Sequence, residues 1–174
     1  MSLPLVIVNP TSASGSTGSS WPRLASELSS QFGGFKNVFT TKSGDATALA
    51  SEAAKKGTSL IIACGGDGTI SEVANGILNS GKDVELGILP SGTGGDFRRT
   101  LEIPSQPREA ARILRTGRTR RIDVGRVIFV NTNGKEATRY FLGVASCGMV
   151  IGNTSILPKS IFSPGNTMFA APGE

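Results

Sequence analysis

The sequence contains no histidine, and this absence removes the most common general base and most zinc sites from consideration. Aromatic residues are also scarce, at 6% of the 174 residues, and no basic segment is interleaved with them. Stacking on single-stranded nucleic acid is therefore disfavoured, and we expect no nucleic-acid partner. Any proton chemistry in this chain must use carboxylates or lysine.

Cysteine and long apolar runs are equally sparse. No run approaches the roughly 20 apolar residues that a membrane span needs, and the apolar segment 3–8 is too short for a secretion signal. The two cysteines, Cys64 and Cys147, lie far apart in apolar segments. This placement predicts buried, unpaired thiols in a reducing compartment. These features predict a cytoplasmic protein. Its net charge of +5 suits anionic partners, including phosphates and the surface of a membrane that it contacts peripherally.

The spacing of apolar residues predicts strands that alternate with single helices. Strands are expected at 3–8, 35–39, 59–64 and 84–90, and helices at 21–32, 45–56, 69–79 and 107–115. Such βαβ units give the α/β class, with a doubly wound parallel sheet.

Three loops rich in glycine and serine follow the ends of predicted strands. Ligands of doubly wound sheets bind at the carboxyl ends of the strands, so these loops are expected to meet at one edge of the sheet. The loops cover residues 9–19, 65–69 and 90–96.

The pattern changes near residue 120, where strand-like runs follow one another without a helix. Asn133 and Gly134 separate two of these runs and are typical of a hairpin turn. We predict an α/β lobe over residues 1–118 and the beginning of an incomplete, β-rich second lobe over residues 119–174. The exposed edge of an unfinished sheet also predicts self-association, such as a homodimer.

The loop 65–69, with the sequence GGDGT, has the chemistry of an anion site. Gly65, Gly66 and Gly68 let backbone N–H groups approach phosphate oxygens, and the helix expected from Thr69 adds its positive end. Asp67 would repel phosphate unless a divalent cation lies between them or the carboxylate takes a proton from an attacking hydroxyl. The alternative is that Asp67 is a turn residue or a helix cap.

The loop 90–96 repeats this arrangement of strand, glycine-rich turn and acidic residue. Ser91 and Thr93 can donate hydrogen bonds to phosphate, and Asp96 is either a second magnesium ligand or a helix cap. The neighbouring Arg98 and Arg99 can pair with phosphates or face solvent.

Glu72 lies one turn into the helix that follows the GGDGT loop. Two roles are open for it: orienting a ligand, or favouring the amino end of its own helix. No loop of the chain matches GxxxxGK[ST] or GxGxxG. These absences argue against a P-loop NTPase and against the standard dinucleotide-binding fold.

Several motifs, IVNPTSASG, GGDGTISEVANGI, LGILPSGTGGDFRR, RRIDVGRV and FLGVASCG, follow one another along the chain. In this order and spacing, the chain from Leu3 to about Met149 resembles the diacylglycerol kinase catalytic-domain family, which includes bacterial lipid kinases and sphingosine kinases. The resemblance implies an ATP-dependent lipid kinase with a nucleotide-binding α/β lobe, a β-sandwich lobe and an active cleft between them. Its acceptor would be a lipid with a free hydroxyl, such as diacylglycerol or a sphingoid base.

The resemblance also implies roles for individual residues. Asp67 is similar to the acidic residue that acts as a catalytic base or in a magnesium network, and Asp67 and Asp96 would bind Mg²⁺. Thr41 resembles a threonine near the nucleoside. The implied nucleotide-binding residues are Asn9, Pro10, Ser14, Gly15, Thr41, Gly65, Gly66, Asp67, Gly68, Thr69, Glu72, Ser91, Gly92 and Thr93.

The chain departs from the family's pattern in two places. Gly95 stands where the family usually has asparagine, and the family continues well past Gly148, where this chain has only the start of a second lobe. Two other functions are therefore open. One is a soluble kinase similar to NAD kinase, because GGDGT fits that wider superfamily, and the other is a nucleotide-binding module without catalysis.

Overall fold

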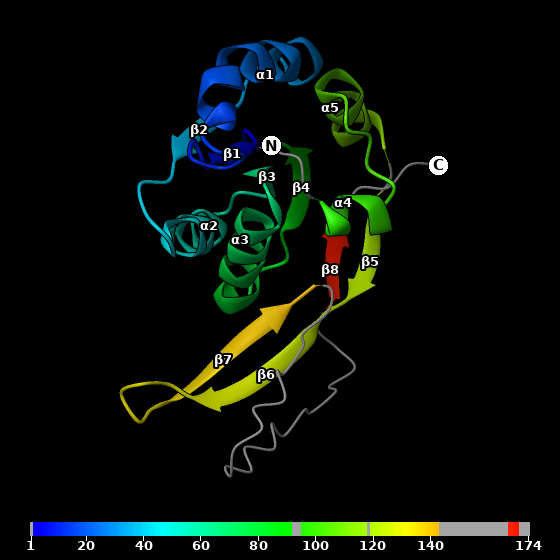
Figure 1. Ribbon diagram of the computed structural model, residues 1–174. Coiled ribbons are helices and arrows are strands. Elements are labelled where there is room, and N and C mark those ends of the chain that lie inside the picture. The colour runs from blue at the N-terminus through cyan, green and yellow to red at the C-terminus, as the bar shows by residue number, and fades with distance from the viewer. Residues whose placement is uncertain (1, 92–94, 118, 143–166, 171–174) are drawn as a thin grey trace.

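A computed structural model describes residues 2–91, 95–117, 119–142 and 167–170 (Figure 1). Its main sheet has the strand order β2-β1-β3-β4-β8-β5. The first four strands along this order are parallel, β8 continues them parallel to β4, and β5 closes the sheet antiparallel to β8. The strands are β1 (Leu5–Val8), β2 (Lys36–Phe39), β3 (Leu60–Gly65), β4 (Glu85–Pro90), β5 (Arg120–Asp123) and β8 (Thr167–Ala170).

Helices cover both faces of this sheet, as the sequence predicts for a doubly wound α/β fold. On one face α1 (Ser16–Phe32) packs against α5 (Pro107–Thr116), and on the other α2 (Asp45–Lys55) packs against α3 (Asp67–Ser80) (Figure 1). The predicted fold class is confirmed. The short helix α4 (Asp96–Thr100) was not predicted, because five residues are too few to show a helical period.

The central strands β1, β3 and β4 are continuous apolar runs because both of their faces are covered by helices. Their interior residues are buried, and alanines of α2 complete the core on one side. Gly76 of α3 lies against α2: a Cβ built on it would be 2.3 Å from the carbonyl oxygen of Thr47 and 2.7 Å from Cβ of Ala50. The two helices can approach this closely only because residue 76 has no side chain.

The strand ends that precede the three loops lie level with one another. Val8 pairs with Phe39 on one side and with Cys64 on the other, and Cys64 pairs with Leu89. The loops after β1, β3 and β4 therefore leave the sheet at the same edge, as predicted. Cys64 itself is buried, also as predicted, while Cys147 lies outside the described residues.

A second, two-stranded sheet follows β5. Its strands β6 (Gly125–Val130) and β7 (Glu136–Phe141) are antiparallel, and the predicted turn at Asn133 and Gly134 joins them, with Gly134 at φ +70°. β7 packs against α3 (Figure 1). The division at residue 118 stays a prediction. β5, which follows that position in the chain, pairs with β8 in the main sheet. None of the helices in the described part of the chain has the length and apolar character that crossing a membrane requires.

Candidate functional site

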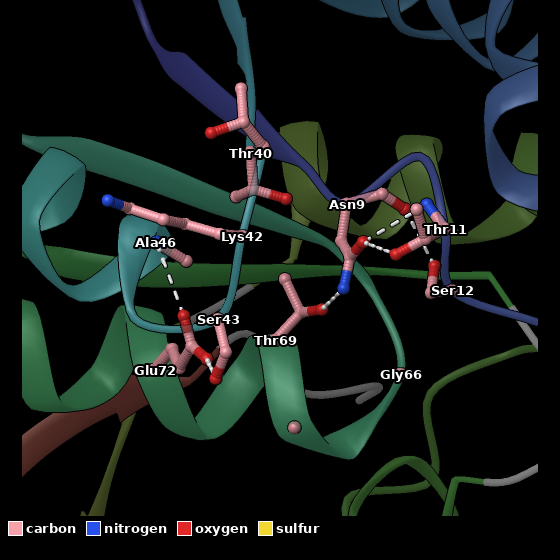
Figure 2. A pocket seen from close by; sticks show the side chains of 12 residues that line it. Asn9, Thr11, Ser12, Thr40, Lys42, Ser43, Ala46, Gly66, Thr69 and Glu72 are labelled. Carbon is pink, nitrogen blue, oxygen red and sulfur yellow. Dashed lines mark hydrogen bonds between the residues drawn. The ribbon is translucent and has the colours of Figure 1, made fainter.

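A hollow of about 310 Å³, which we call the first hollow, opens at the carboxyl ends of β1, β2 and β3 (Figure 2). One of its walls is the first turn of α3, and the opposite wall is the segment between β2 and α2. It brings together six of the predicted nucleotide-binding residues: Asn9, Thr41, Gly66, Gly68, Thr69 and Glu72. The sequence did not single out its other lining residues, which are Thr11, Ser12, Thr40, Lys42, Ser43 and Ala46.

Asn9 connects the loop after β1 to the start of α3. Its Nδ2 donates to Oγ1 of Thr69 at 3.1 Å, and its Oδ1 accepts hydrogen bonds from the amide and hydroxyl of Thr11 at 3.1 and 2.9 Å (Figure 2). The side chain of Asn9 is thus used to hold two loops together beside the hollow.

The other predicted residues of this loop do not line the first hollow. Pro10 covers Gly18 of α1, where a Cβ would lie 3.1 Å from the Pro10 carbonyl oxygen. Ser14 and Gly15 follow in a turn with positive φ values of 55° and 87°. Ser14 adopts this left-handed conformation at a cost of about 1–2 kcal/mol, whereas glycine adopts it freely.

Thr41 lies on the opposite wall and is held by Asp45. The carboxylate Oδ2 of Asp45 accepts from the Thr41 hydroxyl at 2.6 Å, from the Thr41 amide at 2.8 Å and from the Lys42 amide at 3.0 Å. The hydrogen bond from the Thr41 hydroxyl is the largest cause of a lowered pKa at Asp45. Because that proton is given to Asp45, the Thr41 hydroxyl offers an incoming ligand its lone pairs.

Glu72 binds the amino end of a neighbouring helix. Its Oε1 accepts from the Gly44 amide at 3.0 Å and the Ser43 hydroxyl at 3.3 Å, and its Oε2 accepts from the Ala46 amide at 3.2 Å (Figure 2). Gly44, the residue before α2, provides no side-chain cap. Glu72 of α3 therefore caps α2 and fixes the wall formed by residues 40–43, a role that differs from both roles proposed from the sequence.

A second hollow, of about 350 Å³, lies on the other side of the first turn of α3. It brings Asp67 together with Asp96, and Oδ2 of Asp67 accepts from the Asp96 amide at 3.3 Å. Asp67 therefore also binds the first residue of α4, a helix that the sequence did not predict. The remaining lining residues are Ile70, Ser71, Phe97, Thr100, Phe141 and Leu142.

The first turn of α3 divides the predicted site residues between the two hollows. Gly66, Gly68 and Thr69 line the first hollow, while Asp67 lines the second. Gly65 closes β3 directly before this turn, and a Cβ on it would lie 2.5 Å from Oγ1 of Thr69. A side chain at position 65 would therefore displace the turn.

Ser91 ties the third loop to the first. Its hydroxyl shares a 2.7 Å hydrogen bond with Thr17, which shares another, of 2.6 Å, with Ser12 on the wall of the first hollow. The Ser91 amide also donates to the carbonyl oxygen of Gly65 at 3.3 Å. The predicted contributions of Gly92 and Thr93 lie outside the described residues.

Residues 4–127 match the family described as the diacylglycerol kinase catalytic domain. The chain belongs to this family. It is 42% identical over 123 residues to a diacylglycerol kinase of Bacillus subtilis, covering 70% of this chain and 38% of that protein. It is 34% identical over 162 residues to a diacylglycerol kinase of Staphylococcus haemolyticus, covering 91% of this chain and 46% of the relative.

Solved structures agree with this assignment. A diacylglycerol kinase from Bacillus anthracis superposes with a TM-score of 0.64 at 31% identity, over 77% of this chain and 45% of that one. The chain thus spans about half the length of the diacylglycerol kinases that it matches. The matched segment contains every residue that lines the first hollow, together with Asp67 and Asp96, whereas Phe141 and Leu142 of the second hollow lie beyond it.

Within this diacylglycerol kinase domain, the two arginines after the third loop are occupied by protein groups. Arg98 donates to the Ile103 carbonyl oxygen at 3.0 Å, and Arg99 forms an ion pair with Asp96. Arg99 nevertheless faces solvent, one of the two alternatives weighed from the sequence, because 58% of its side chain is exposed. The other alternative, pairing with phosphate, stays a prediction.

Proposed function

We propose that this chain forms the nucleotide-binding part of an ATP-dependent lipid kinase, which transfers the γ-phosphate of ATP to a free lipid hydroxyl. The observation that carries this proposal is the pair of hollows on either side of one helix turn. A polar hollow with glycine backbone lies on one side of the first turn of α3, and a carboxylate beside apolar side chains lies on the other.

The first hollow suits the nucleotide. A Cβ built on Gly66 or Gly68 would meet nothing within 4 Å, so an anion can approach the backbone at the amino end of α3. That end carries a partial positive charge and free N–H groups, the usual partners of phosphate. Lys42 adds a full positive charge on the same lining.

The second hollow suits the hydroxyl of a lipid acceptor. Asp67 can take the proton of a hydroxyl placed beside it, while Ile70, Phe97 and Phe141 provide apolar surface for the adjoining chain. An apolar lining favours diacylglycerol or a sphingoid base over NAD, whose ribose and phosphates are polar. The net charge of +5 favours contact with the anionic membrane that would present such a lipid.

The residues present also fit magnesium. Mg²⁺ needs only one or two protein carboxylates beside phosphate oxygens and water, and Asp67 and Asp96 line one hollow. The described residues contain no cluster of three or more His, Cys, Asp or Glu side chains, so a hydrated ion shared with ATP fits better than an ion held by protein alone. Bound there, Mg²⁺ would neutralise charge on the transferred phosphoryl group.

The proposal is tested by incubating the 174-residue chain with Mg²⁺ and γ-labelled ATP in mixed micelles. Separate reactions contain dioctanoylglycerol, sphingosine or NAD as acceptor. Three proteins are compared: the wild type, Asp67→Asn and Asp83→Asn. Asp83 is exposed and precedes β4 at the opposite edge of the sheet, so the last variant is a matched control.

We expect label in a lipid, loss of this transfer by at least about a hundredfold in Asp67→Asn, and normal transfer in Asp83→Asn. Labelled NAD without labelled lipid would overturn the proposal in favour of a soluble kinase. Calorimetric binding of ATP without transfer to any acceptor would identify a nucleotide-binding module instead.

A further inference from the structure

Asn75 is a polar side chain buried between α3 and β7, with 7% of its surface exposed. Its Oδ1 accepts a hydrogen bond from the Tyr140 amide at 2.8 Å, and its Nδ2 donates to the Tyr140 carbonyl oxygen at 2.9 Å. Nδ2 also donates to the Ser71 carbonyl oxygen at 2.8 Å. The side-chain amide thus pairs with both backbone groups of one strand residue, as the backbone of an adjacent strand would.

This contact determines where the hairpin lies. A two-stranded hairpin is marginally stable by itself, so its position depends on what it packs against. In the described part of the chain, β7 packs against α3, and Asn75 supplies two hydrogen bonds across that interface. A buried amide whose partners are all satisfied also disfavours other registers, because a shifted strand would leave it unpaired.

The residues that follow Tyr140 in the chain are Phe141, the last residue of β7, and Leu142, and both line the second hollow. The ring of Phe141 lies over Gly125 of β6, where a Cβ would be 2.1 Å from the ring. α3 therefore carries Asp67 at its amino end and, about two turns later, the side chain that anchors the opposite wall.

We infer that Asn75 is a positioning residue for the lipid acceptor, which holds Phe141 and Leu142 beside Asp67 through its pairing with Tyr140. The inference rests on the proposed lipid kinase function. The inference predicts that a change at Asn75 affects binding of the lipid and not of ATP, because Asn75 acts on the wall of the second hollow and does not line the first.

Asn75→Asp tests this role with the smallest change of shape. The new carboxylate can still accept from the Tyr140 amide, but its second oxygen faces the carbonyl oxygens of Tyr140 and Ser71 and has no proton to donate. We expect amide hydrogen exchange in Glu136–Phe141 to become about tenfold faster. The KM for dioctanoylglycerol should rise by about tenfold, while the KM for ATP changes by less than about twofold.

Asn79→Asp is the matched control, because it makes the same substitution one turn later on α3 at an exposed position. Gly125→Ala is a second test in case Asn75→Asp fails to fold, since its new Cβ would lie 2.1 Å from the Phe141 ring and displace it while Asn75 stays unchanged. It should also raise the KM for the lipid selectively.

The inference would be overturned if Asn75→Asp changed the KM values for lipid and ATP equally, or if it left amide hydrogen exchange in β7 unchanged. An unchanged KM for the lipid in both Asn75→Asp and Gly125→Ala would also overturn it. A wild type that labels no lipid would refute the proposed function instead. The exchange rates would then still show whether Asn75 holds β7.

Discussion

Replacing Gly76 with alanine should destabilise the protein, although alanine is the better helix former. On propensity alone the change would stabilise α3 by about 1 kcal/mol. The new Cβ, however, would lie 2.3 Å from the Thr47 carbonyl oxygen, about 1 Å short of ordinary contact, and 2.7 Å from Cβ of Ala50. Backbone and Cβ atoms cannot rotate away, so α2 and α3 must move apart.

We expect the cost of this displacement to exceed the gain in propensity. Overpacking a tight interface costs about 1–3 kcal/mol. Because the 2.3 Å contact is with a backbone atom, we expect a cost of about 2–3 kcal/mol, and subtracting the gain of about 1 kcal/mol leaves a net loss in the free energy of unfolding of about 1–2 kcal/mol. Urea denaturation followed by circular dichroism would show this as a fall in the midpoint of about 1 M. ATP binding should weaken too, because α3 and the segment before α2 form opposite walls of the first hollow.

Gly68→Ala is the matched control for stability. Gly68 lies on the same helix, but a Cβ there would meet nothing within 4 Å. This variant should be as stable as the wild type or slightly more stable. A Gly76→Ala protein with an unchanged or higher midpoint would refute the reasoning, because it would show that α2 and α3 can separate at no cost.

Three further predictions follow from polar contacts and burial. Glu72→Gln should weaken ATP binding, measured by calorimetry, by about threefold to tenfold, because the single oxygen of the neutral amide cannot accept from both the Gly44 and the Ala46 amides. Unchanged binding would contradict the capping role. The carboxyl of Asp45 has a lowered pKa in the folded state, so its stabilising contribution is complete above the unfolded value, near 3.8, and is lost as pH falls through the lower folded value. An NMR titration should place its midpoint below 3.8, and Thr41→Val should raise that midpoint by removing the hydroxyl donor. Burial raises the pKa of Cys64 to about 12, so iodoacetamide at pH 8 should leave this thiol unmodified until urea unfolds the protein, as peptide mapping would show.

The sequence was sufficient to predict the α/β class and the meeting of the loops, because both depend on strong local patterns. Buried parallel strands are apolar throughout, and glycine-rich turns mark their ends. The hairpin turn at Asn133 and Gly134 was predicted for the same reason. The family assignment followed from motifs that lie within these loops.

The division of the site into two hollows was not predicted, and the reason is the start of α3. The predicted helix began at Thr69, whereas the observed helix begins at Asp67. Successive residues of a helix point about 100° apart, so this difference turns Asp67 away from the glycines that flank it. A loop conformation for residues 65–68 had suggested a single site.

The tertiary roles of Glu72 and Phe141 left no local signal. Glu72 caps the start of α2 by binding the amide of Ala46, which is 26 residues earlier in the chain. Phe141 reaches the second hollow from a hairpin that lies far after α3 in the chain. The segment 40–43 could have been found, because it follows the end of a predicted parallel strand just as the glycine-rich loops do. Only Thr41 of this segment was named, through the family resemblance, and its neighbours were not singled out because the segment lacks glycine-rich composition.

The hydroxyl groups of Ser12, Thr17 and Ser91 contain three protons but take part in four contacts, two with each other and two with the carbonyl oxygens of Asn9 and Ser12. The directions in which these protons point are therefore interdependent. If a phosphate oxygen accepts the proton of Ser91, Thr17 must turn its own proton toward Ser91 to keep their contact and release the Ser12 carbonyl. A ligand at the third loop would thus reverse the direction of the Thr17–Ser91 hydrogen bond and free the Ser12 carbonyl oxygen of the first loop, with no displacement of any heavy atom.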